Sequence, residues 1–354
     1  MNIGFLYGLQ IHKAGTGGSV HGYQLAKNLA DSGHHLYTWY WTDPESHLLT
    51  HFRGRQAFTF LKAIDALYIR LEWGGPSAQY PLLRYLSRKR IPVIWEINGL
   101  PEEKAFHGSS KEEIDRIKHR LRRYAKHVDA AVCVSDGIAQ FAKDELGITN
   151  TMVIPNGSDP ALFRPMQKPI SEGSPLIVAW VGTTKAGWHD FDTMLEAARI
   201  LEEKQEDIVF WLYGDSSELP GSLPSNIIPK GLLPYEQLAA ELPNADVGLH
   251  LFRPEISATL DGSPLKQFDY MSAGLALVAQ DDGQRKILME EWQAGIPAGK
   301  GASGLAATLS RLAKDRSLVR MLGENGRRAV EEHFNWRRAA EKTVELLTQL
   351  TTLK

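Results

Sequence analysis

Short apolar runs alternate with helical patterns along the chain, and this alternation restricts the possible fold more than any other feature of the sequence. The runs that we interpret as strands are MNIGFLYG, HHLYTWYW, ALYIRLEW, PVIWEIN and AAVCVS in the first half, and LIVAWVG, IVFWLYG, DVGLHLF and LALVAQ in the second. Helical stretches such as residues 19–33 lie between them; Ser19 is expected to cap this one and Gly33 to end it. Strands that alternate with helices are typical of βα units. The sequence therefore predicts an α/β protein with two doubly wound parallel sheets.

The length of 354 residues predicts two domains, because a single hydrophobic core stops growing at roughly 250–300 residues. A stretch rich in Pro, Gly and Ser at residues 154–175 marks the junction. We expect one domain over residues 1–165, a second over residues 166–335, and a last helix over residues 336–354 that crosses back to the first domain. Ligands of such sheets bind outside the carboxyl ends of the strands, so we expect the site in a cleft that both domains face.

The composition is that of an ordinary globular protein, with 43% apolar and 23% charged residues. No apolar run approaches the roughly 20 residues that cross a bilayer. The first residues lack a basic region and a cleavage site of small residues, which predicts a cytoplasmic protein. The single cysteine, Cys133, excludes an intrachain disulfide and a cysteine-clustered zinc site. It lies in an apolar run and is expected to pack in the core.

Positive charge is concentrated in the first half. Residues 1–165 carry 20 lysines and arginines against 16 aspartates and glutamates, whereas the rest of the chain carries 20 against 26. The densest basic stretches are residues 84–90 and 116–127. Each can be a solvated helix face; together, residues 84–126 can form a patch for an anionic acceptor or for the cytoplasmic face of a membrane. No nucleic-acid motif accompanies them, so we expect no nucleic-acid partner.

Two glycine-rich turns precede helical patterns, where unpaired backbone N–H groups can bind an anion. The first, GTGGSVHG at residues 15–22, lacks the full G-x-G-x-x-G spacing, and its glycines can equally make a tight turn. The second, DGSPLK at residues 261–266, is more specific: Gly262 permits close approach of a ligand and Pro264 suits a first helical turn.

Charged residues flank the second turn. We expect this helix to begin at residue 262. Lys266 adds positive charge to the start of the helix, and Asp261 and Asp269 are separated by seven residues, so both can face one cavity. A diphosphate would bind the amides and the lysine, and the carboxylates would accept hydrogen bonds from sugar hydroxyls. Asp261 can also be a simple helix cap, but this alternative leaves Lys266 and Asp269 unexplained.

The stretch DGSPLKQFDYM at residues 261–271 resembles the motif of family 4 glycosyltransferases, retaining enzymes with the GT-B fold of two Rossmann-like domains. That family has two glutamates with this separation, and aspartate stands in both positions here. Further stretches resemble the family in the same order: GGSVHGYQLAKNLADSGHHL, VIPNGSDPALFRP, VGTTKAGWHDFDTMLEAARIL, NADVGLHLF and FNWRRAAEKTVELL. The resemblance covers nearly the whole chain.

The resemblance implies roles for the site residues. Asp269 would bind the ribose and Asp261 the transferred sugar, while the backbone of a short segment would hold the diphosphate together with Lys266. Gly17 and Gly18 would close over it from the N-terminal, acceptor-side domain. The segment that would hold the diphosphate consists of Gly262, Ser263, Pro264 and Leu265.

The chain departs from the family at two places. The family's arginine in its GR-x-x-x-x-KG stretch is missing from GTTKAGWH at residues 182–189, so Lys185 is the candidate substitute and Thr184 is expected on the donor side. In the N-terminal domain the family's histidine is replaced by Asn98, which can position a hydroxyl but cannot act as a base. The pair Asp190 and Asp192 matches a D-x-D metal motif, but its place before a helix favours capping.

We therefore expect a retaining glycosyltransferase of hexosyltransferase type, acting in cell-envelope polysaccharide synthesis. It would move a sugar from a nucleotide-diphosphate sugar to a hydroxyl of a glycan, lipid-linked or small-molecule acceptor. No metal or other cofactor is expected, since the twelve histidines show no ligand spacing. Two alternatives stay open: a non-catalytic nucleotide-sugar-binding partner subunit, and a nucleotide-sugar epimerase.

Overall fold

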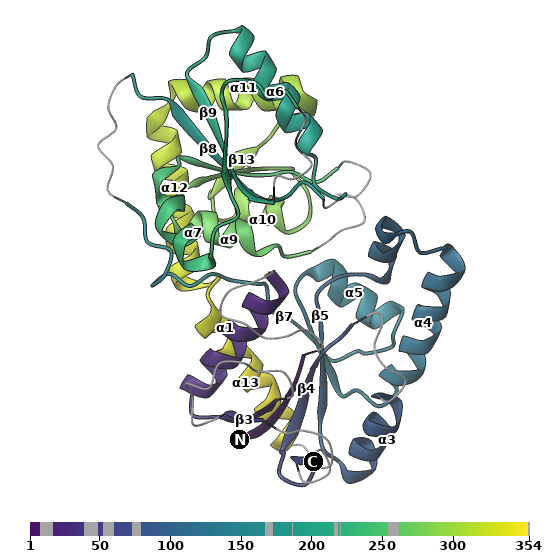
Figure 1. Cartoon of the computed structure of the whole chain (residues 1–354). Coiled ribbons are helices and arrows are strands. Elements are labelled where there is room, and N and C mark those ends of the chain that lie inside the picture. The colour runs from purple at the N-terminus through teal and green to yellow at the C-terminus, as the bar shows by residue number, and fades with distance from the viewer. Residues whose placement is uncertain are drawn as a thin grey trace. The chain divides into compact units, whose positions relative to one another are not determined.

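The computed structural model describes residues 1–7, 17–38, 49–51, 60–72, 79–166, 173–185, 187–215, 219, 221–253 and 262–352. It divides into two compact units (Figure 1). The first contains residues 1–156, 260–263 and 336–354, and the second contains residues 157–259 and 264–335. The expected boundary after residue 165 is thus wrong by one short segment, because residues 157–165 pack with the second unit.

The first unit is built on a parallel sheet. Its described strands are β1 (Asn2–Leu6), β2 (His35–Thr38), β3 (Leu49–His51), β4 (Ala66–Arg70), β5 (Val93–Ile97), β6 (Ala130–Cys133) and β7 (Thr151–Val153), in the order β3-β2-β1-β4-β5-β6-β7. Its described helices are α1 (Gly17–Asp31), α3 (Gln79–Lys89), η2 (Pro101–His107), α4 (Lys111–Ala125), α5 (Asp136–Asp144) and α13 (Trp336–Thr352). The last of these, α13, packs along α1 (Figure 1).

The second unit repeats the plan. Its described strands are β8 (Leu176–Thr183), β9 (Ile208–Asp215), β10 (Ile227–Gly231), β11 (Val247–His250), β12 (Ala276–Ala279) and β13 (Gly295–Pro297), all parallel and in the order β10-β9-β8-β11-β12-β13. Its described helices are α6 (Phe191–Glu203), α7 (Tyr235–Glu241), η3 (Leu242–Asn244), α9 (Leu265–Ser272), α10 (Gly283–Glu290), α11 (Gly301–Lys314) and α12 (Arg316–Glu332).

Both strand orders are those of a doubly wound fold, in which the chain starts at the middle of the sheet, moves to one edge and then returns to build the other half. The order reverses between β1 and β4 in the first unit and between β8 and β11 in the second. Ligands of such sheets bind at this reversal, outside the carboxyl ends of the strands. The fold thus marks one candidate position in each unit.

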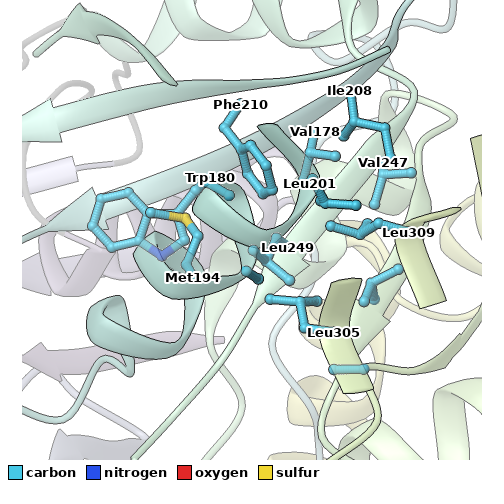
Figure 2. Packing of buried hydrophobic residues seen from close by; sticks show 14 of the residues in the cluster. Val178, Trp180, Met194, Leu201, Ile208, Phe210, Val247, Leu249, Leu305 and Leu309 are labelled. Carbon is cyan, nitrogen blue, oxygen red and sulfur yellow. The ribbon is translucent and has the colours of Figure 1, made fainter. Parts of the chain in front are cut away.

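The core of the second unit has a layer on each face of its sheet. Val178 and Trp180 of β8 face the layer covered by α6 and α11, whereas Ala179 faces the layer that contains residues of α7 and α9. Figure 2 shows the first layer, in which Met194 and Leu201 of α6 lie among strand residues. Successive residues of a strand point to opposite faces, so both faces of this buried sheet are apolar.

A close contact seats α9 on the sheet. The Tyr270 ring packs directly on Gly248 of β11, where a Cβ atom would lie 2.2 Å from the ring. The Tyr270 hydroxyl accepts a hydrogen bond from the Val181 amide at 2.7 Å and reaches the Leu249 carbonyl oxygen at 3.4 Å. Val181 belongs to β8 and Leu249 to β11, so Tyr270 bridges the two strands at which the order reverses. This contact fixes the position of α9 at that point.

Three local expectations can be compared with the structure. Asp190 caps α6 by accepting a hydrogen bond from the Thr193 amide at 3.2 Å, as predicted. Cys133 is buried, and burial raises the pKa of its thiol to about 12, in line with a core residue. Ser19 is not a cap, because α1 begins two residues earlier, at Gly17. Among the described residues, no helix combines the length and apolar character needed to cross a bilayer.

We predict that Gly248→Ala destabilises the second unit, because the added methyl group must displace Tyr270 and with it α9. The expected loss is about 1–3 kcal/mol in the free energy of unfolding, measured by urea denaturation. Gly187→Ala is the matched control, since a Cβ there has no neighbour within 4 Å in the part of the chain that the structure describes. Equal stability of the two variants would contradict the tight seating of α9.

Candidate donor site

Lys266 lies in the first turn of α9 and is partly buried against the end of β8. Its Nζ atom lies 3.2 Å from Nε2 of His189 and 5.5 Å from the centre of the Trp180 ring. No carboxylate within the described part of the chain forms an ion pair with it. Desolvation of the ammonium lowers the pKa of Lys266 to about 7. A cation so placed is costly without a ligand and favourable beside an anion.

Two buried histidines lie near Lys266. Burial and the charge of Lys266 lower the pKa of His189 to about 2, so its neutral ring can accept a hydrogen bond from the lysine. His250, at the end of β11, is completely buried. Its pKa is also lowered, by burial and then by Lys266 and Arg285. Both rings are therefore neutral, and Lys266 carries the positive charge beside them.

Asp269 lies one turn after Lys266 on the same helix and is 5% exposed. Its Oδ1 atom accepts hydrogen bonds from the Ser158 hydroxyl at 2.6 Å and the Tyr235 hydroxyl at 3.0 Å. Burial raises the pKa of Asp269 to about 7, although both hydroxyls act in the opposite direction. Its Oδ2 atom accepts no hydrogen bond from a described residue and can receive one from a ligand.

The two residues expected to act at the end of β8 both contact Asp215. Lys185 is exposed and pairs with Asp215, with Nζ 2.9 Å from Oδ2. Thr184 is also engaged with Asp215, to whose carbonyl oxygen its amide donates at 3.1 Å. Both residues lie at the carboxyl end of the sheet, but Lys266 has the more desolvated charge. The substitution of Lys185 for the missing arginine stays a prediction.

The segment before α9 corrects two details. The helix begins at Leu265, with Pro264 as its cap in an extended conformation, and not at residue 262. Pro264 has no N–H group and cannot donate to a phosphate. Ser263 is buried, and its hydroxyl accepts a hydrogen bond from the backbone N–H group of Asn156 at 3.0 Å. Among the described residues, no atom lies within 4 Å of a Cβ placed on Gly262, which leaves room for a ligand to approach. Asp261 lies outside the described residues.

The remaining predicted residues belong to the first unit. Gly17 and Gly18 form the beginning of α1. Asn98 follows β5, and its Nδ2 group donates a hydrogen bond to Oε1 of Glu96. Glu96 is the centre of a buried cluster that sequence reasoning missed; its other neighbours are His21, Arg70, Tyr7 and Tyr68.

The basic stretches of the first unit form α3, α4 and the residues that follow them. The Tyr80 and Tyr124 rings stack with centres 5.1 Å apart, and the Arg123 guanidinium lies 4.1 Å from the centre of the Tyr80 ring. The pKa of His127 is lowered, first by desolvation and then by Arg84, Arg88 and Lys126. Arg84, Arg88 and Lys126 are therefore close enough to one another that all three lower the pKa of the same imidazole, His127.

Solved structures resemble the whole chain. A sucrose-phosphate synthase from Thermosynechococcus elongatus is 17% identical, with all of both chains covered and a TM-score of 0.68. Anabaena HepE, solved in complex with UDP and glucose, is 15% identical over 99% of this chain and 100% of its own, with a TM-score of 0.69. WaaG, a glycosyltransferase involved in lipopolysaccharide biosynthesis, is 16% identical over 98% and 99% of the two chains, with a TM-score of 0.65. These similarities show the GT-B fold.

Two family models match most of the sequence between them. The model described as Glycosyltransferase Family 4 matches residues 15–162, and the model described as Glycosyl transferase-like matches residues 192–345. The chain belongs to the family 4, group 1 glycosyltransferases. A comparison with curated proteins finds no match.

In this glycosyltransferase, α9 carries Lys266 and Asp269 at the reversal point of the second unit. Sequence reasoning missed their partners, which come from distant parts of the chain: Ser158, His189, Tyr235 and His250. Among the described residues, no three His, Cys, Asp or Glu side chains cluster as metal ligands would.

We predict that Asp269→Asn stabilises the protein at alkaline pH. The pKa of Asp269 rises from 3.8 in the unfolded chain to about 7 in the folded protein. The unfolded state therefore binds fewer protons between these values, and the free energy of unfolding falls as the pH rises from about 4 to about 7. Asparagine keeps the acceptor oxygen and avoids this loss, so the gain should reach roughly 2–4 kcal/mol at pH 8 and largely vanish near pH 4.

Urea denaturation of both proteins at pH 4.5, 6 and 8 measures the effect. The shifted pKa of Lys266 is present in both proteins and cancels in the difference. Asp192→Asn, the same change at a side chain that is 80% exposed, is the control and should stay within about 0.5 kcal/mol. A gain from Asp269→Asn that does not depend on pH would contradict the raised pKa.

Proposed function

We propose that the chain is an active, retaining glycosyltransferase. It moves a sugar, a hexose in our proposal, from a nucleotide-diphosphate sugar to a hydroxyl of a glycan, lipid-linked or small-molecule acceptor. The observation that carries this proposal is Lys266, a desolvated cation without a carboxylate partner in the described part of the chain. It lies at the start of a helix, at the point of the sheet where ligands of this fold bind.

A diphosphate fits this position for electrostatic reasons. Lys266 has a pKa of about 7 without a ligand, so it is about half protonated near neutral pH. A nearby phosphate favours the charged form and raises that pKa. Negative charge grows on the phosphate as the bond to the sugar breaks, and a fixed cation stabilises it. Lysine thereby supplies charge that a metal ion supplies in other enzymes, and we propose that no metal is required.

Asp269 fits the ribose. Its Oδ1 atom is held by Ser158 and Tyr235, which leaves Oδ2 to accept a hydrogen bond from a ribose hydroxyl. The deprotonated form is the better acceptor, and hydroxyl donors favour it. Binding of the nucleoside therefore offsets part of the desolvation of this carboxylate.

The retaining outcome rests on the family resemblance. We propose a same-face displacement in which the acceptor oxygen bonds to the anomeric carbon as the bond from that carbon to the phosphate oxygen breaks. The acceptor proton passes to the departing phosphate oxygen, so no proton is left over. Asp261 would stabilise the sugar, which carries positive charge in such reactions.

The relatives suggest the first ligands to test. HepE was solved with UDP-glucose, so UDP-glucose is the first donor probe. WaaG acts in lipopolysaccharide biosynthesis, which supports a role for this chain in cell-envelope polysaccharides. We also propose that the basic cluster of α3 and α4 attaches the protein to an anionic membrane face, where a lipid-linked acceptor would lie.

We predict that Lys266→Met weakens UDP binding about 10- to 150-fold and leaves uridine binding unchanged, because the lysine contacts phosphate only. Isothermal titration calorimetry with UDP and uridine measures both. Lys314→Met is the control, because this lysine is 74% exposed and its ion-pair partner is Glu206.

Equal losses for UDP and uridine would show that Lys266 does not contact phosphate. The same titrations in EDTA, followed by assays of UDP release from UDP-glucose, test the metal proposal. Activity that returns only with added Mn²⁺ or Mg²⁺ would overturn it. Tight binding of UDP-glucose without turnover, across a broad set of acceptors, would favour the non-catalytic partner subunit.

We predict that the protein sediments with vesicles containing 30% phosphatidylglycerol and not with pure phosphatidylcholine. Each basic residue near an anionic surface contributes about 1 kcal/mol, so Arg88→Glu with Lys126→Glu should lower binding about 30-fold or more. The control is the pair Lys204→Glu and Lys300→Glu in the second unit. Equal losses for the two pairs would show that α3 and α4 do not form the contact.

A further inference from the structure

Glu96, the last residue but one of β5, is 1% exposed and has both carboxylate oxygens engaged. Its Oε2 atom accepts hydrogen bonds from the hydroxyls of Tyr7 and, at 2.7 Å, Tyr68. Its Oε1 atom accepts from Nδ2 of Asn98 and lies 3.3 Å from Nε2 of His21. Burial alone would raise the pKa of Glu96, but His21, Arg70 and Tyr7 outweigh it and lower the pKa to about 2. Glu96 is therefore a permanent carboxylate.

This carboxylate determines the orientation of the Asn98 amide. An ionised carboxylate only accepts hydrogen bonds, so the amide must present its NH₂ group to Glu96 and turn its oxygen away. The Oδ1 atom of Asn98 is buried and has no hydrogen-bond partner among the described residues. A buried amide oxygen without a partner costs free energy that a hydroxyl donor would restore. The amide is thus arranged to receive a hydroxyl.

The cluster around Glu96 also connects β4, β5 and α1, which carry the candidate site residues of the first unit and their neighbours. Asn98 follows β5, and Arg70 ends the neighbouring strand β4, with Nη1 3.7 Å from Oε1 of Glu96. His21 lies in the second turn of α1, close to the glycines at its start, and its ring packs on Trp336 with centres 4.9 Å apart. The buried carboxylate of Glu96 therefore fixes the carboxyl ends of β4 and β5 relative to the beginning of α1.

We propose that Glu96 is a positioning residue of the acceptor side. It orients Asn98 so that Oδ1 accepts a hydrogen bond from a hydroxyl of the acceptor, and through His21 it holds the first part of α1. This inference rests on the proposed function, since the hydroxyl belongs to the acceptor of that reaction. A purely structural role is the alternative: Glu96 would then stabilise the fold without acting through Asn98.

A double-mutant cycle separates the two roles. The rate of UDP release from UDP-glucose is measured with glycerol and with methyl α-D-glucopyranoside as hydroxyl acceptors. Asn98→Ala should raise the KM for the acceptor about five- to tenfold, the effect of one hydrogen bond, and leave the KM for UDP-glucose within about twofold. Glu96→Gln should raise the acceptor KM in the parent protein and have no further effect in Asn98→Ala. Additive effects would overturn the proposal.

A second measurement needs no substrate. NMR spectra of protein labelled with ¹⁵N at asparagine should show the Asn98 NH₂ protons widely separated and slow to exchange, because one of them is held by a carboxylate. Glu96→Gln should bring them together while circular dichroism shows an intact fold. Unchanged Asn98 signals in a folded Glu96→Gln protein would refute the positioning role. If the unmutated protein does not turn over UDP-glucose with any acceptor, that result would instead count against the proposed function, whatever the Asn98 signals show.

Discussion

The hydroxyl of Tyr270 connects the two strands at which the second sheet reverses its order, and the candidate donor site depends on this connection. Strands β8 and β11 pair only at Val178 and Ala179 of β8, near their amino ends. Beyond that pairing, Tyr270 accepts from the Val181 amide and reaches the Leu249 carbonyl oxygen. Because Tyr270 belongs to α9, the same contact seats the helix that carries Lys266 and Asp269. Gly248 is required beneath the ring, since no side chain fits there.

Seating α9 so closely places two charges of opposite sign under strong desolvation. Burial lowers the pKa of Lys266 and raises that of Asp269, each to about 7. Both groups are therefore near the point of losing their charge in the ligand-free protein. A ligand that brings a phosphate to one and hydroxyls to the other favours both charged forms at once. Desolvation of Lys266 and Asp269 thus raises the free energy of the ligand-free site, and it increases the free-energy difference between the ligand-free and the ligand-bound protein.

The sequence predicted the inner strands of both sheets and missed all four strands at their edges, β3, β7, β10 and β13. Inner strands are buried on both faces and read as apolar runs, whereas the edge strands have three to five residues, and β10 is largely exposed.

In the site, the motif located Lys266 and Asp269 because they share one helix. It could not locate Ser158 or Tyr235, whose contacts with Asp269 span 111 and 34 residues of sequence. Helix starts were placed with errors of two or three residues at α1 and α9, since glycine and proline mark a turn without fixing its first helical residue.

The two units share one strand order but differ in the buried charge near the carboxyl ends of their strands. The first unit has a carboxylate with internal partners, and the second has a lysine without a carboxylate partner among the described residues. In the first unit Glu96 is surrounded by donors and cations, so its cluster is satisfied internally except at the amide oxygen of Asn98 and one nitrogen of Arg70. In the second unit Lys266 has a neutral histidine and an aromatic ring as its described neighbours. An internally paired cluster can hold side chains in position but attracts an anion weakly, whereas an unpaired cation attracts an anion strongly. Electrostatics therefore favours the second unit for the proposed diphosphate, and it leaves the first unit suited to recognise hydroxyl groups by hydrogen bonding.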